Sequence, residues 1–70
     1  MADHISLTVN GEPRRTPPGS SIADLVASLG LDPAKVAVER NGEIAPRSRL
    51  ADIVLDEGDT LEIVHFVGGG

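Results

Sequence analysis

Three consecutive glycines, Gly68, Gly69 and Gly70, carry the most distinctive chemistry of this 70-residue chain. Glycine has no Cβ, so such a run supports neither a strand nor a helix, and we expect a flexible tail. At about 3.3–3.6 Å per residue, this tail would reach roughly 10 Å beyond a folded body. We expect Gly70 to carry a free α-carboxylate, which a side-chain-free tail could bring into a narrow active site of another protein.

That α-carboxylate would need activation before a nucleophile could attack it. With a pKa of about 3.3–3.7 it is an anion at neutral pH. Adenylation would give it a good leaving group, but the phosphoryl transfer needs metal and positive charge. The chain has a formal net charge of −5, so we expect a partner enzyme to supply both. The sequence contains no cysteine, so any sulfur that the chain carries would have to sit at its carboxyl end.

Other catalytic and metal-binding arrangements find little support. His4 and His65 are the only histidines, and a domain of this size with one helix has little interior for a catalytic triad. We therefore predict no catalytic residue, with His65 partly exposed on a strand and His4 exposed. Asp56, Glu57 and Asp59 lack the ligand alternation of a calcium loop, so we predict a solvated turn and no metal site.

The charge balance also bears on partners. Six basic residues are outnumbered by eleven acidic ones, and Arg14-Arg15 is the only basic pair. Nucleic-acid binding needs a basic face, so it is not expected. The acidic surface instead suggests a protein partner that presents a basic surface. The N-terminus has no signal-peptide pattern and no apolar run could span a bilayer, so we expect a cytoplasmic protein without a membrane segment.

The first half of the chain predicts a hairpin followed by a helix. Apolar residues alternate with polar ones over 5–9, Asn10-Gly11 is a hairpin signal, and residues 12–16 form the return strand. Pro13 lacks an N–H and places that strand at an edge. A helix is expected over 21–29, with an apolar stripe and a capping box in which Ser21 is followed by Asp24.

The second half predicts a strand at 36–40, a second Asn-Gly turn, a short return at 43–45, a helical turn within 48–53 and a final strand at 60–67. The first and last strands would be central and parallel neighbours. The expected fold is therefore α+β, a β-grasp with a mixed sheet of four to five strands and one main helix across one face. Residues 1–67 would form a single domain and 68–70 its tail.

The final strand also suggests a docking surface. If Leu61 and Ile63 face the helix, then Val64 and Phe66 lie on the open face of the sheet. Phe66 is the only aromatic residue and stands two residues before the glycines. Because aromatic residues are favoured interface anchors, we predict that Val64 and Phe66 dock a partner and so position the tail.

Two segments, residues 39–47 (Glu-Arg-Asn-Gly-Glu-Ile-Ala-Pro-Arg) and 58–70, resemble the ThiS family of thiamine-biosynthesis sulfur carriers, and the likeness extends over essentially the whole chain. The resemblance implies a ubiquitin-like β-grasp fold. It also implies that a ThiF-like enzyme uses ATP and magnesium to adenylate Gly70, with Gly69 completing the diglycine end. Sulfur from cysteine, delivered through a desulfurase, would then give a thiocarboxylate for a ThiG-like thiazole synthase. The chain would thus be a protein co-substrate with no cofactor and no turnover of its own.

Three other interpretations remain open. The chain could be another β-grasp sulfur carrier, such as the MoaD-like small subunit of molybdopterin synthase or a carrier for tRNA thiolation. It could be a ubiquitin-like modifier, because the same adenylate would serve both fates. It could also be an interaction module whose glycine tail is inert, in which case removing Gly69-Gly70 would change nothing.

Overall fold

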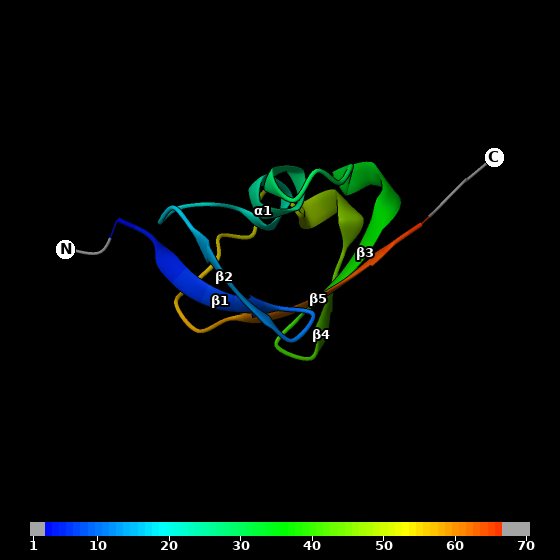
Figure 1. The fold of residues 1–70 in the computed structure, drawn as a ribbon. Coiled ribbons are helices and arrows are strands. Elements are labelled where there is room, and N and C mark those ends of the chain that lie inside the picture. The colour runs from blue at the N-terminus through cyan, green and yellow to red at the C-terminus, as the bar shows by residue number, and fades with distance from the viewer. Residues whose placement is uncertain (1–2, 67–70) are drawn as a thin grey trace.

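A five-stranded mixed sheet carries one α-helix across one of its faces in the computed structural model, which describes residues 3–66 (Figure 1). The helix is α1 (Ile22–Ser28), and two short 3-10 helices are η1 (Pro33–Lys35) and η2 (Arg47–Arg49). The strands are β1 (Ile5–Val9), β2 (Glu12–Thr16), β3 (Val36–Arg40), β4 (Glu43–Ala45) and β5 (Thr60–His65). The strand order is β2-β1-β5-β3-β4.

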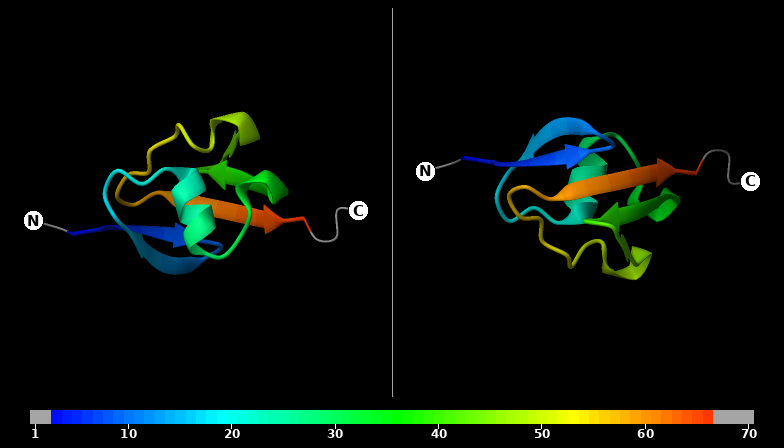
Figure 2. Two further views of the ribbon diagram at one scale, coloured as in Figure 1. Left: turned by 90° about the horizontal axis from the view of Figure 1, so that it is seen from above. Right: turned by 90° about the horizontal axis from the view of Figure 1, so that it is seen from below.

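The central pair of strands comes from opposite ends of the chain. β1 and β5 are parallel neighbours, whereas the β1–β2, β3–β5 and β3–β4 pairs are antiparallel. Figure 2 shows β5 running through the middle of the sheet, between β1 and β3. The connection between the two parallel strands contains β2, α1, β3 and β4. This arrangement is the ubiquitin-like β-grasp fold, and it confirms the predicted fold class with five strands.

Both hairpins turn through Asn-Gly pairs as predicted. Asn10 and Gly11 have φ of 51° and 81°, and Asn41 and Gly42 have φ of 52° and 84°. Positive φ at both central residues defines a type I′ turn, whose twist matches that of the flanking strands. β2 lies at the edge of the sheet, so Pro13 interrupts no central ladder.

The helix begins and ends where its local signals place it. Ser21 is the N-cap and accepts a hydrogen bond from the Asp24 amide, while the Asp24 carboxylate accepts one from the Ser21 amide. This reciprocal pair is the predicted capping box, with aspartate in place of glutamate. The chain leaves the helix through Gly30, which has a φ of 80°.

The helix stripe and the inner face of the sheet form one hydrophobic core. The buried apolar side chains of the core are Leu7, Val9, Ile22, Leu25, Val26, Val36, Val38, Ala45, Leu50, Leu55, Leu61 and Ile63. They come from every strand except β2, from α1, and from the segment between β4 and β5. A domain of this size has room for only one such core, to which all of these side chains contribute.

Two parts of the second half differ from the sequence expectation. The helical turn expected within 48–53 is a 3-10 helix that begins earlier, at Arg47, and η1 before β3 was not predicted. The segment after η2 instead caps α1, because the Ile22 and Ala23 amides donate to the carbonyls of Ile53 and Leu50. The first helical amides lack partners inside a helix, so these contacts satisfy them and fix a long irregular segment in place.

Candidate functional site

Strand β5 carries the chain toward its predicted reactive end. The strand finishes at His65, so the predicted strand over 60–67 is wrong at Phe66, the last described residue. The expected strand end at Val67 and the predicted site residues Gly68, Gly69 and Gly70 lie outside the described residues. The structure therefore describes two features of the site: the hydrogen bonds that fix β5 and the surface of the sheet around this strand.

Both Asn-Gly turns hold β5 through their asparagine side chains. Asn10 accepts a hydrogen bond from the Ile63 amide at 2.8 Å and donates one to the Ile63 carbonyl at 3.1 Å. Asn41 accepts a hydrogen bond from the Thr60 amide at 2.9 Å. The Asn10 side chain thus takes the place of a strand neighbour at Ile63, beyond the paired residues of β1. The strand that leads to the chain end is fixed on both sides.

Asp59 anchors the start of β5, and the prediction that residues 56–59 form a solvated turn is wrong at this residue. Asp59 is only 6% exposed. Its carboxylate accepts hydrogen bonds from Arg40 Nε at 2.9 Å, from Asn41 Nδ2 at 3.0 Å and from the Asp56 amide at 2.8 Å. Arg40 also contacts the exposed carboxylate of Asp56 at 3.1 Å. Residues from the β3–β4 turn therefore partner the acidic turn, which no local pattern reveals.

The titration of Asp59 follows from these contacts. Burial raises the pKa of the carboxyl group, but the hydrogen bonds from the Asp56 amide, Asn41 and Arg40 and the Arg40 charge outweigh it. The pKa of Asp59 therefore lies below its ordinary value of 3.8, and the group is ionised at neutral pH. The ionised form is the one that accepts all three hydrogen bonds.

The open face of the sheet carries the predicted docking residues. Leu61 and Ile63 are buried in the core, whereas Val64 and Phe66 are 59% and 44% exposed. The alternation along β5 therefore places these side chains as the sequence indicated. That they dock a partner stays a prediction.

Two neighbours of these residues were missed by sequence reasoning. Ile44 is 78% exposed, more than any other large apolar residue among residues 3–66. Its register partner is Glu39, and the Ala45 side chain beside it turns into the core. Arg47 lies with its guanidinium carbon 5.9 Å from the centre of the Phe66 ring, within the range of a cation–π contact. Alternation within the three residues of β4 was too short a signal to assign Ile44 to a face.

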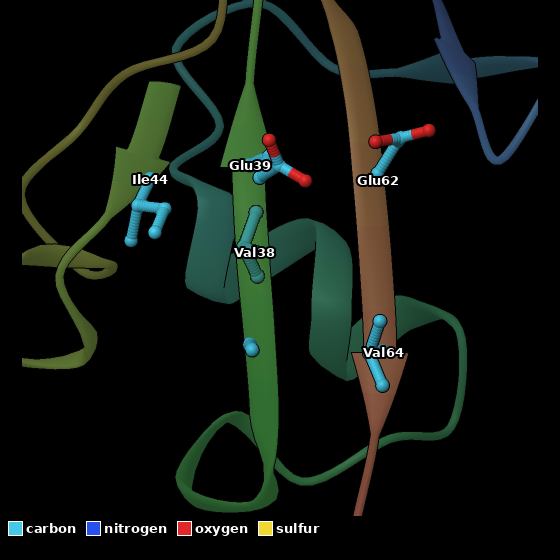
Figure 3. A pocket seen from close by; sticks show the side chains of 6 residues that line it. Val38, Glu39, Ile44, Glu62 and Val64 are labelled. Atoms are coloured by element: carbon cyan, nitrogen blue, oxygen red, sulfur yellow. The ribbon is translucent and has the colours of Figure 1, made fainter. Parts of the chain in front are cut away.

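A shallow hollow lies between these strands on the open face. It measures about 160 Å³ and is lined by Ala37, Val38, Glu39, Ile44, Glu62 and Val64. Figure 3 shows Val64 below Glu62 on β5, with Glu39 between Ile44 and Glu62. The hollow thus has apolar walls and two carboxylates.

The two histidines and the possible metal ligands are the other candidate groups of the sequence. His65 is an exposed residue of β5, as predicted, whereas His4 is half-buried and not exposed. Across residues 3–66, no group of three metal-ligating side chains gathers. Over the same span, no helix combines the length and the apolar character needed to cross a membrane.

Comparison with known proteins identifies the family. The model of the ThiS family matches residues 7–70 of the chain. The chain belongs to the ThiS family. A solved ThiS structure, that of the thiamine biosynthesis protein from Geobacter metallireducens, superposes with a TM-score of 0.77 at 32% identity and covers 94% of this chain and 100% of that one.

Two curated relatives of this ThiS-family chain differ greatly in length. The sulfur carrier protein ThiS of Bacillus subtilis is 50% identical over 50 residues, which cover 71% of this chain and 76% of that protein. The thiazole synthase of Paramagnetospirillum magneticum is 47% identical over 66 residues, which cover 94% of this chain. The chain spans only 20% of the length of that synthase. A ThiS-like segment thus occurs within a much longer protein named as a thiazole synthase.

Proposed function

We propose that this chain is a sulfur carrier that supplies sulfur for thiazole formation in thiamine biosynthesis. One observation supports this above all: the match to the ThiS family over residues 7–70, together with 50% identity to a protein named as a sulfur carrier. The chain would act in the cytoplasm as a co-substrate, while its partners do the catalysis.

The proposed chemistry takes place at Gly70. A carboxylate oxygen of Gly70 attacks the α-phosphorus of ATP in a ThiF-like enzyme, and pyrophosphate leaves. The terminal sulfur of a persulfide, formed from cysteine on a desulfurase, then attacks the carbonyl carbon, and AMP leaves as an acyl disulfide forms. A second thiol reduces the S–S bond of this acyl disulfide, which releases the thiocarboxylate and leaves a disulfide between the two thiol sulfurs. Magnesium and the positive charge that this transfer needs come from the enzyme. Gly68 and Gly69 keep the approach to Gly70 free of side chains.

The thiazole synthase is the proposed acceptor of the sulfur. The presence of a ThiS-like segment within the synthase of Paramagnetospirillum magneticum supports this, because joining the two in one chain keeps donor and acceptor together. The open face near the end of β5 is suited to docking, because Val64, Phe66 and Ile44 expose apolar surface there.

Intact mass spectrometry tests the proposal. The chain is incubated with the ThiF-like enzyme of the same organism, ATP, magnesium, a cysteine desulfurase, cysteine and a thiol reductant. We expect one exchange of oxygen for sulfur at Gly70 and none in a chain that lacks Gly69 and Gly70. Attachment of the chain to lysines of other proteins would instead indicate a ubiquitin-like modifier, and no ATP-dependent change would indicate an inert tail.

A further inference from the structure

The hollow on the open face carries two like charges that the fold does not use. Glu39 and Glu62 face each other directly across the β3–β5 pair. Both are exposed, and neither takes part in any ion pair or side-chain hydrogen bond among residues 3–66. Like charges directly opposite each other destabilise a sheet. The described part of the chain therefore offers no structural reason for this pair.

The nearby cations are engaged elsewhere. Arg40, which follows Glu39 in β3, points to the other side of the strand, where it binds Asp59 and Asp56. Arg47 lies over the Phe66 ring. The carboxylate pair is thus left as a concentrated negative charge beside the exposed apolar side chains of Ile44 and Val64 (Figure 3).

The geometry points to an arginine of a partner protein as the occupant. An arginine side chain has an apolar stem, which would lie along Ile44, Ala37 and Val64, and a charged head. Its planar guanidinium carries five donors and can bind Glu39 and Glu62 at the same time, which a single lysine ammonium does less well. Arginine is also enriched in protein interfaces.

Building on the proposed function, we propose that this arginine belongs to the thiazole synthase and that its entry into the hollow docks the carrier. Along β5 the hollow ends at Val64, two residues before Phe66, so an interface here would bring the last described residue of the chain close to the synthase. The relative in which a ThiS-like segment lies within a protein named as a thiazole synthase supports the synthase as the partner, and the exposed apolar and acidic side chains of the hollow assign it to this face.

Binding of the double variant Glu39→Gln/Glu62→Gln to the thiazole synthase of the same organism tests the inference. We expect affinity at low salt, measured by isothermal titration calorimetry, to fall roughly five- to tenfold. The salt dependence should also become weaker. The matched control Asp3→Asn/Glu12→Gln removes the same charge from exposed positions outside the hollow and should bind like the wild-type chain.

Thermal unfolding separates loss of docking from loss of fold. Because the pair repels, the Glu39→Gln/Glu62→Gln variant should unfold at or above the wild-type temperature. Affinity equal to that of the control would overturn the inference, and so would a lowered unfolding temperature, because the pair would then be structural. An equal loss of affinity for the ThiF-like enzyme would overturn the assignment to the synthase.

A sulfur-loading assay distinguishes a failure of this inference from a failure of the proposed function. The Glu39→Gln/Glu62→Gln variant should still exchange oxygen for sulfur with the ThiF-like enzyme, as judged by intact mass. Failure of the wild-type chain to load sulfur would contradict the carrier function itself. Normal loading with unchanged synthase affinity in the double variant would contradict only the docking by arginine.

Discussion

The substitution Asp59→Ala probes the contact that anchors the start of β5. It removes three hydrogen bonds to a carboxylate that is 6% exposed and leaves Arg40, whose side chain is 27% exposed, with only Asp56. Each hydrogen bond to a charged group contributes about 1.5–3 kcal/mol, but Arg40 and Asn41 can partly return to water. We expect a loss of about 2–4 kcal/mol.

That loss is large for this protein. A 70-residue domain has a free energy of unfolding of roughly 4–10 kcal/mol, so Asp59→Ala should remove about a fifth of it or more. The matched control is Asp56→Ala, which breaks an ion pair with Arg40 in which the Asp56 side chain is 78% exposed. Such a pair contributes at most about 1 kcal/mol.

Urea unfolding followed by far-UV circular dichroism measures both variants. The chain has no tryptophan or tyrosine, so intrinsic fluorescence is not a useful probe. If Asp59→Ala loses no more stability than Asp56→Ala, the buried network does not hold β5 in the way described here.

The same carboxylate predicts how stability depends on pH. The folded pKa of Asp59 is lowered from 3.8, so the unfolded chain binds the proton more tightly than the folded one. The stabilisation is therefore present above about pH 4 and is lost as the pH falls through the folded pKa. Asp59→Asn should reduce this acid-induced loss. An identical slope in the wild-type chain and the variant between pH 5 and pH 2, each measured by urea unfolding, would contradict the lowered pKa.

Four further substitutions test other contacts and surfaces of the protein. Asn10→Gly keeps the positive φ of the turn but removes the two hydrogen bonds to Ile63, so urea unfolding should show a loss of about 1–2 kcal/mol; no loss would mean that the turn alone fixes β5. Ser21→Ala removes the N-cap and should cost about 1 kcal/mol by the same measurement, whereas the control Ser48→Ala, at an exposed position, should cost almost nothing. Phe66→Ala and Val64→Asp should weaken binding to the thiazole synthase about tenfold in calorimetry while the circular dichroism spectrum is retained; wild-type affinity in both would remove these residues from the docking face.

Local patterns were enough to predict α1 and the five strands, but not the 3-10 helix η1. These patterns depend on neighbours within a few residues, so the sequence shows them directly. They are the alternation over residues 5–9 and 60–65, the two Asn-Gly pairs and the capping box at Ser21. The parallel pairing of β1 with β5 also followed, because the long path between these two strands suits a parallel crossover.

The partners of individual side chains could not be predicted in the same way. Asp59 looks like part of an acidic surface turn, yet Arg40 and Asn41, 19 and 18 residues away, hold it in a buried site. Asn10 reads as a turn residue only, yet its side chain binds Ile63 53 residues later. Each contact exists because β5 lies between β1 and β3, two strands that come much earlier in the sequence.

The sequence by itself determined which residues share a face within one strand, where the turns fall and which chemical groups the chain possesses, since these depend on backbone geometry and composition. Only the tertiary structure decided which faces meet: it placed Glu39 opposite Glu62, exposed Ile44 and Val64 around one hollow, and buried Asp59. Strand register is the physical reason. A shift of two residues between β3 and β5 would keep the apolar side chains of both strands in the core and still exchange the neighbours on the open face, so side-chain alternation alone carries no information about that shift.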